Sequence, residues 1–242
     1  MRGIYMRDKI KNKNYFNEQL EYVYSSINRY EGLLSKVIEA HGEYSEGANN
    51  GYAILSMFYT QALNLLYSAG KEIQEMKGDF NNFIKYYTLS WSIDNGYIDL
   101  IRTLSLGVLL NIDTSEFKNL KKKIINEGLD DYLVNFLLSY IDPSWQFNSN
   151  DFYFKGIYEP VKNIIEEDNR YISIELLKVY LEKQWYDIHN ECAWYNSHKS
   201  KQDTYYGYWA YEAGAIAKIL ELNDEELKDQ QYYPYDLAHF NS

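Results

Sequence analysis

The fold is organised around the stretch Tyr205-Tyr206-Gly207-Tyr208-Trp209-Ala210-Tyr211-Glu212. Apolar residues continue from it at steps of four, three and four, namely Trp209, Ala213, Ile216 and Leu220. This spacing places them on one face of an α-helix. The sequence therefore predicts a central helix that begins near Trp209 and packs its apolar face against the rest of the chain.

The residues around this helix predict tight packing with aromatic rings. Gly207 precedes the helix, where the backbone needs conformational freedom. Small side chains at 210, 213, 214, 215 and 217 would let a neighbouring helix approach closely. Pro234 cannot continue a helix, so residues 232–236 are expected to form an ordered turn whose rings fold back onto the core.

Further aromatic segments carry a resemblance to a known family. Trp185-Tyr186, the run from Trp194 to Lys199, and Tyr232-Tyr233-Pro234-Tyr235-Asp236-Leu237 accompany the opening stretch. Together, over about residues 180–237, they resemble the C-terminal domain of PoNi immunity proteins. The segment 104–110, Leu-Ser-Leu-Gly-Val-Leu-Leu, more loosely resembles that family's N-terminal domain.

The resemblance implies an immunity protein that neutralises a PoNe-type DNase toxin, which bacteria deliver into competitors. It implies a structural role for the residues that match the C-terminal signature. These residues are Trp185, Trp194, His198, Tyr206, Gly207, Tyr208, Trp209, Glu212, Tyr233, Pro234 and Asp236. The partner would be a protein, and the toxin-binding residues do not follow from the signature.

Helical periodicity extends over most of the remaining chain. Apolar residues predict a helix over 16–37 closed by Gly42, a buried helix over 97–112, and one long helix over 174–195. No segment alternates as a strand would. We expect an all-α bundle of eight to ten helices, with an N-terminal helical half (1–141) and a C-terminal half (142–242) packed together. The irregular stretch 142–157 would form their boundary.

Composition indicates a protein of the cytoplasm. The single cysteine, Cys192, excludes an internal disulfide and fits a reducing compartment. Residues 1–17 carry no apolar signal-peptide core, and no run approaches the roughly 20 apolar residues of a membrane span. The 27 tyrosines provide contact area with polar tips, and core packing accounts for most of them.

The net charge of −11 is concentrated toward the C-terminus. Residues 151–242 hold 17 acidic against 9 basic side chains, a balance of −8. This charge disfavours direct binding to nucleic acid or an anionic membrane and suits a basic protein partner, although it could also serve solubility alone. The candidate partner-binding acidic face comprises Glu166, Glu167, Asp168, Glu182, Asp187, Glu191, Asp203, Asp224, Glu225, Glu226 and Asp229.

No metal or cofactor is expected. His189, Cys192 and His198, with Asp203, could form a zinc site, and the same histidines and cysteine could suggest a nucleophile. However, Cys192 falls on the predicted apolar stripe, and no oxyanion-stabilising motif accompanies it. Ordinary structural roles are therefore favoured for these residues.

Two lone acids among aromatic residues leave a second hypothesis open. Glu212 and Asp236 could act as an acid pair, or they could accept structural hydrogen bonds. We favour a non-enzymatic immunity protein. The alternative is a helical enzyme or small-molecule-binding protein with an aromatic pocket around Glu212, His198 and Asp236. Whether the chain forms homo-oligomers stays open.

Overall fold

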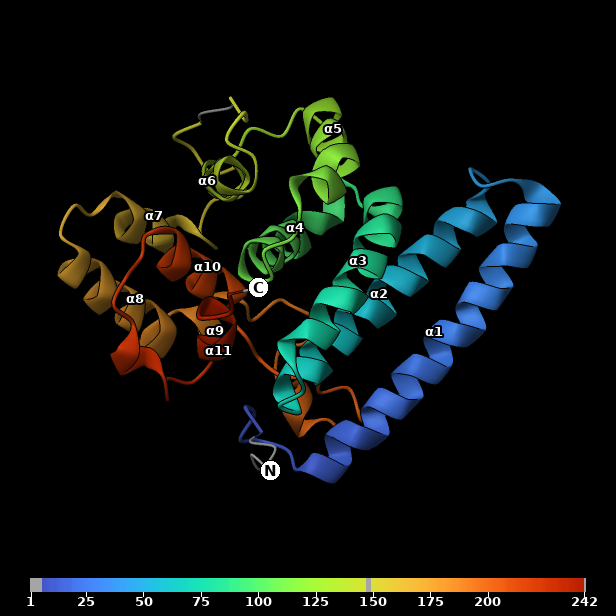
Figure 1. Cartoon of the computed structure of the whole chain (residues 1–242), viewed down its shortest axis with the longest axis horizontal. Helices are drawn as coiled ribbons and strands as arrows, with labels where there is room; N and C mark the ends of the chain where they lie inside the picture. The colour runs from blue at the N-terminus through green and yellow to red at the C-terminus, as the bar shows by residue number, and fades with distance from the viewer. Residues whose placement is uncertain (1–5, 147–148, 242) are drawn as a thin grey trace. The chain divides into compact units, whose positions relative to one another are not determined.

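The computed structural model describes residues 6–146 and 149–241 and is all-α (Figure 1). These residues form eleven α-helices, nine of them with seven or more residues, and contain no strand. The predicted fold class is confirmed, and the nine longer helices agree with the predicted eight to ten. Residues 147 and 148, within the predicted irregular stretch, lie outside the described residues; the described part of 142–157 is irregular.

Contacts between Cα atoms group the chain into two compact units. Unit 1 comprises Met1–Ser92 and His198–Gly207, and unit 2 comprises Ile93–Ser197 and Tyr208–Ser242. The C-terminal part of the chain thus contributes to both units. The domain division at residues 141/142 stays a prediction.

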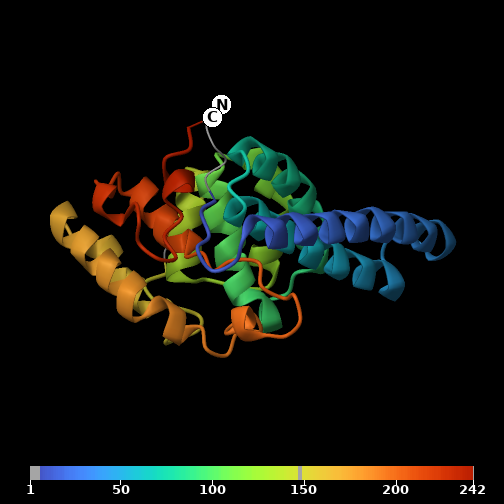
Figure 2. The ribbon, with the colours of Figure 1, turned by 90° about the horizontal axis from the view of Figure 1, so that it is seen from below.

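Three long helices form most of unit 1: α1 (Lys13–His41), α2 (Glu46–Ser68) and α3 (Ile73–Ser90). α2 packs against both α1 and α3, and Figure 2 shows α1 and α2 side by side. As predicted, α1 ends at Gly42, which has a φ of 86° and donates its backbone N–H to the Ile38 carbonyl at 2.8 Å. The apolar face of α1 is buried and comprises Phe16, Leu20, Val23, Ile27 and Leu34.

Residues 198–207 are held in unit 1 by tyrosine side chains. Tyr205 is fully buried, and its hydroxyl donates to the buried carboxylate of Asp8. The Tyr15 hydroxyl donates to the Tyr205 carbonyl at 2.9 Å and accepts from the Tyr205 N–H at 3.2 Å. The Ser68 hydroxyl donates to the Tyr206 carbonyl at 3.0 Å. These bonds attach a late segment of the sequence to the start of α1 and the end of α2.

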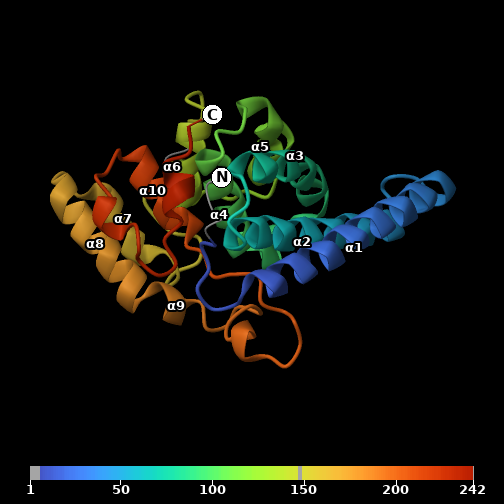
Figure 3. The ribbon, with the colours of Figure 1, turned by 60° about the horizontal axis from the view of Figure 1, so that its bottom comes forward.

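Unit 2 is built around α4 (Ile93–Leu109), which contacts both α6 (Tyr132–Ile141) and α10 (Tyr211–Ile219). Its buried apolar side chains confirm the predicted buried helix. Figure 3 shows α8 (Arg170–Lys183) beside α10. The remaining helical elements are η1 (Thr114–Phe117), α5 (Lys118–Asn126), α7 (Glu159–Glu166), α9 (Trp185–Ile188), η2 (Ser197–Lys199), η3 (Glu225–Leu227) and α11 (Tyr235–Ala238).

The central helix begins two residues later than predicted. α10 starts at Tyr211, so Trp209 precedes it and is half-buried, although Ala213 and Ile216 are fully buried as expected. The preceding residues are held by the Ala210 N–H, which donates to the Tyr232 carbonyl at 2.9 Å. Gly207 adopts a φ of 111°, a conformation that strongly favours glycine.

Candidate functional site

The predicted long helix over 174–195 is wrong, and its interruption creates the site. α8 ends at Lys183, α9 is a single turn, and the chain from 189 to 196 is irregular. Trp194 folds back so that its ring stacks on Trp185, with centroids 5.5 Å apart and planes 19° apart. In a continuous helix these two residues would be about 13.5 Å apart along the axis. Aromatic stacking therefore replaces helical continuation here.

A cluster of aromatic rings in unit 2 collects around Trp185. The Tyr232 ring lies 4.8 Å from Trp185 between centroids and is parallel to Tyr186, at 5.5 Å and 6°. Tyr208 lies 5.5 Å from Trp194. Trp185 and Tyr208 are buried, but Tyr186, Trp194 and Tyr232 are only half-buried. The cluster thus joins the core of unit 2 to its surface.

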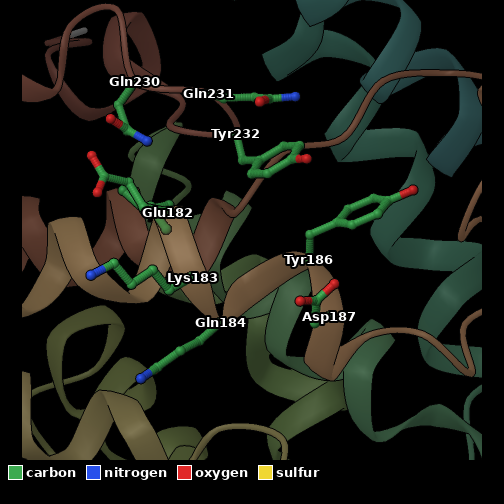
Figure 4. Close-up of a pocket in the computed structure, with 9 residues that line it drawn as sticks. Glu182, Lys183, Gln184, Tyr186, Asp187, Gln230, Gln231 and Tyr232 are labelled. Atoms are coloured by element: carbon green, nitrogen blue, oxygen red, sulfur yellow. The ribbon is translucent and has the colours of Figure 1, made fainter.

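A pocket of about 300 Å³ opens where the Tyr186 and Tyr232 rings reach the surface. Figure 4 shows both tyrosines on one side of it, with Asp187 next to Tyr186, whereas Glu182 and Gln230 lie on the opposite side. The remaining lining residues are Leu181, Lys183, Gln184 and Gln231. Aromatic faces, carboxylates and carboxamides therefore meet in one recess.

The backbone at Tyr232 is unusual for a bulky residue. Its φ is 73°, in the left-handed region, which costs on the order of 1 kcal/mol for a residue that is not glycine. Stacking on Trp185 and Tyr186 and the hydrogen bond from the Ala210 N–H maintain this conformation. The pocket wall is consequently set by several contacts at once.

The carboxyl group of Glu212 is buried in unit 2 and does not line this pocket. It is 4% exposed and accepts a hydrogen bond from the Tyr180 hydroxyl at 3.0 Å. Burial raises its pKa from 4.5 to about 7, although the hydrogen bonds it accepts and the charge of Arg102 oppose the shift. Its observed contacts are those of an internal hydrogen-bond acceptor.

His189 and Cys192 have structural surroundings. His189 is buried, with Nδ1 2.7 Å from the Trp185 carbonyl and Nε2 3.3 Å from the Tyr158 hydroxyl, and burial lowers its pKa to about 4. Burial raises the pKa of the Cys192 thiol to about 11, which disfavours the nucleophilic thiolate. Within the described residues, no three His, Cys, Asp or Glu side chains are grouped to hold a metal ion.

The residues of the alternative aromatic pocket have different environments. Glu212 and Asp236 both belong to unit 2, but Glu212 is buried, whereas Asp236 lies exposed in the first turn of α11. His198 belongs to unit 1 and is half-buried. None of the three lines the observed pocket. This arrangement does not support an acid pair formed by Glu212 and Asp236.

The other signature residues lie mainly in packed positions. Trp185, Tyr208, Tyr233 and Pro234 are buried, and Tyr206 is half-buried. Pro234 directly precedes α11, a one-turn helix where the sequence predicted only a turn. Trp185, Tyr208 and the partly exposed Trp194 belong to the aromatic cluster of unit 2, whereas Tyr206 belongs to unit 1.

Asp224 is an exception among the candidate acidic-face residues because it is buried. Its carboxylate accepts from the Tyr233 hydroxyl and lies 3.1 Å from His239 Nε2. The predicted placement of Asp224 on an exposed face is therefore wrong. The acids that are exposed or half-buried are Glu166, Glu167, Asp168, Glu182, Asp187, Glu191, Asp203, Glu225, Glu226 and Asp229. Asp203 is the member of this set that belongs to unit 1.

The net negative charge of the chain comes from unit 2. Unit 2 contains 24 acidic and 12 basic residues, a balance of −12, whereas unit 1 contains 11 acidic and 12 basic residues, a balance of +1. The sequence halves had suggested a gradient of charge. The tertiary grouping instead produces one nearly neutral unit and one strongly acidic unit.

Sequence reasoning missed the pocket residues Tyr186, Gln230, Gln231 and Tyr232 as a group. Tyr186 was noted as part of the aromatic signature, and Tyr232 was expected to fold onto the core. Their half-exposure follows from the break after α8, for which the apolar periodicity offered no signal. The clustering of tyrosine beside acid and glutamine was the available hint.

Comparison with known proteins defines the class of this chain as an immunity protein. Residues 7–122 match the N-terminal domain of PoNe immunity proteins (PoNi), and residues 129–237 match the C-terminal domain. The two matches occur in order and cover nearly the whole chain. The chain belongs to the PoNi immunity protein family. No curated protein matches it significantly.

A solved structure has the same fold at low sequence identity. The crystal structure of protein PA2201 from Pseudomonas aeruginosa is 14% identical, with a TM-score of 0.70. The match covers 97% of this chain and 89% of that chain. At this identity the likeness establishes the fold alone. Within the described residues, no helix is long and apolar enough to cross a membrane.

Proposed function

We propose that this protein binds a PoNe-type DNase toxin directly and covers its DNA-binding or catalytic surface, without itself catalysing a reaction. The match to both domains of the PoNi family is the observation that carries this proposal. Because the target of a DNase is DNA, protection would take place in the cytoplasm. The toxin is the partner, and neither nucleic acid nor membrane is bound directly.

The charge of unit 2 supports a mechanism of electrostatic competition with DNA. A DNase must present a basic surface to phosphates, and unit 2 carries a balance of −12. Exposed carboxylates would occupy positions that phosphates otherwise take. Long-range attraction would accelerate encounter, whereas desolvated contacts would govern dissociation.

Co-expression with the cognate nuclease tests the function as a whole. The expected result is survival of the host cell and a complex that survives gel filtration, in which the nuclease no longer cleaves or binds DNA. An interface of standard size buries about 1,600 Å² in total, which a chain of this length can supply. Absence of both protection and a complex at low salt would refute the proposal.

Matched charge reversals test the role of unit 2. Glu225→Lys with Glu226→Lys changes the net charge by four in unit 2, and Glu18→Lys with Glu21→Lys makes the same change on exposed positions of α1 in unit 1. We expect the first variant to associate with the nuclease at least about threefold more slowly than the second. Losing the exposed pair of Glu226 with Lys178, 3.2 Å apart, should hardly affect stability. Equal association rates would argue against steering by this part of unit 2.

A further inference from the structure

We propose that the pocket lined by Glu182, Asp187 and the Tyr186–Tyr232 ring pair receives an arginine side chain of the partner protein. This inference rests on the proposed function, which identifies the partner as the nuclease toxin. It adds the place on this protein where the partner binds and the chemical groups that bind it. Each pocket residue belongs to unit 2, the acidic unit.

The size of the pocket suits a single side chain. Its volume of about 300 Å³ is at the lower end of the range for sites that enclose whole small molecules. It lies at the surface, where α9 and residues 230–232 meet, so a side chain protruding from another protein can enter it without unfolding any helix.

The aromatic wall provides a flat, electron-rich surface. Tyr186 and Tyr232 are parallel within 6°, and both are half-buried. A planar guanidinium group can lie flat against such a ring by cation–π attraction, which an ammonium group does less well. Because Tyr186 and Tyr232 also contact other rings of the cluster, the wall is ordered before the partner arrives.

The carboxylates on the two sides of the pocket provide the complementary charge. Among the described residues, no Lys, Arg or His nitrogen lies within 4.0 Å of the Glu182 or Asp187 carboxylate. Lys183 also lines the pocket, but Figure 4 shows its side chain directed away from the two rings. The charged groups nearest the recess between the two sides are therefore the Glu182 and Asp187 carboxylates.

Neutral acceptors extend the recognition beyond charge. Gln184, Gln230 and Gln231 line the same recess, although Figure 4 shows the Gln184 side chain directed away from the two rings. Their carboxamide oxygens can accept hydrogen bonds from guanidinium N–H groups, of which arginine has five in a fixed planar arrangement. Arginine presents its donors as a planar fork, so it can bind carboxylates and amide oxygens through several hydrogen bonds at once and should bind here more tightly than lysine.

A titration with amino-acid derivatives tests the pocket without the toxin. The probes are N-acetyl-arginine amide, N-acetyl-lysine amide and N-acetyl-citrulline amide, in which a neutral urea replaces the guanidinium. We expect saturable NMR shifts of Tyr186 and Tyr232 with arginine, at a dissociation constant on the order of 1 mM. Citrulline should bind at least about tenfold more weakly, and lysine should bind more weakly than arginine. Equal binding of citrulline or lysine, or no shift at these tyrosines, would overturn the inference.

Pocket variants then test its role in the complex. Glu182→Gln with Asp187→Asn should abolish the arginine shifts and weaken the complex with the nuclease by about tenfold or more, mainly through faster dissociation. Glu175→Gln with Glu221→Gln, at exposed positions of unit 2 outside the pocket lining, removes the same number of charges and should leave the dissociation rate unchanged.

The two measurements separate failure of the pocket from failure of the proposed function. If the wild-type protein binds and protects but the double variant binds equally well, the pocket inference is overturned and toxin binding stands. If the wild-type protein does not bind the nuclease, the proposed function fails, and the amino-acid titration still decides whether the pocket selects arginine.

Discussion

Replacing Glu212 with glutamine should remove a pH dependence of stability that burial of this carboxyl creates. Its pKa rises from 4.5 to about 7 in the folded protein, so the folded state holds a proton that the unfolded state releases. Stability from this group is therefore fully present below about pH 4.5 and is lost as the pH rises to about 7. The shift corresponds to about 3 kcal/mol between pH 4 and pH 8.

The glutamine side chain introduced by Glu212→Gln keeps the shape of the protonated acid and can still accept from the Tyr180 hydroxyl. We expect wild type and variant to have similar free energies of unfolding at pH 4. At pH 8 the variant should be more stable than wild type by about 3 kcal/mol. Urea denaturation at steps of half a pH unit measures the difference in free energy of unfolding between the two proteins. The titration of all other groups is common to both proteins and cancels in this difference. A difference that stays constant from pH 4 to pH 8 would refute the raised pKa.

Three further expectations concern packing, a buried acid and salt. Gly107→Ala should destabilise the protein by about 1–3 kcal/mol, because the new Cβ would overlap the Phe117 ring. Gly32→Ala, with nothing within 4 Å of its Cβ, should instead be neutral or stabilise α1 by up to about 1 kcal/mol, and thermal unfolding of both variants compares them. Asp224→Ala should lower the free energy of unfolding by about 1–3 kcal/mol, because it leaves the buried Tyr233 hydroxyl without its acceptor. Glu225→Ala, on the surface, should stay within about 0.5 kcal/mol of wild type, and equal losses in the two variants would place Asp224 on the surface as well. Raising the ionic strength above about 0.1 M, where the screening length is about 10 Å, should slow association with the nuclease more than it changes the dissociation rate. Stopped-flow mixing measures the two rates separately, and an association rate that does not depend on salt would exclude electrostatic steering.

The sequence by itself determined the helical class and the family. Apolar spacing predicted α1 and its end at Gly42 because a helix repeats every 3.6 residues and glycine readily adopts positive φ. The aromatic segments after residue 180 carried the resemblance that the matches over residues 7–122 and 129–237 established. Both are local properties, readable from neighbouring residues.

Only the tertiary structure decided where the site lies and which acids are exposed. Periodicity continued past Lys183, but the helix ends there, Trp194 stacks back on Trp185, and residues 230–232 line the pocket together with residues from 181 to 187. Adjacent acids likewise differ: the buried carboxylate of Asp224 accepts from the buried Tyr233 and lies beside the exposed His239, whereas Glu225 faces solvent. Hydrogen bonds from Tyr15 and Ser68 assign residues 198–207 to unit 1, which leaves the whole negative balance in unit 2. These outcomes depend on contacts between residues far apart in sequence. A local sequence pattern does not show which of the competing long-range contacts is the more stable.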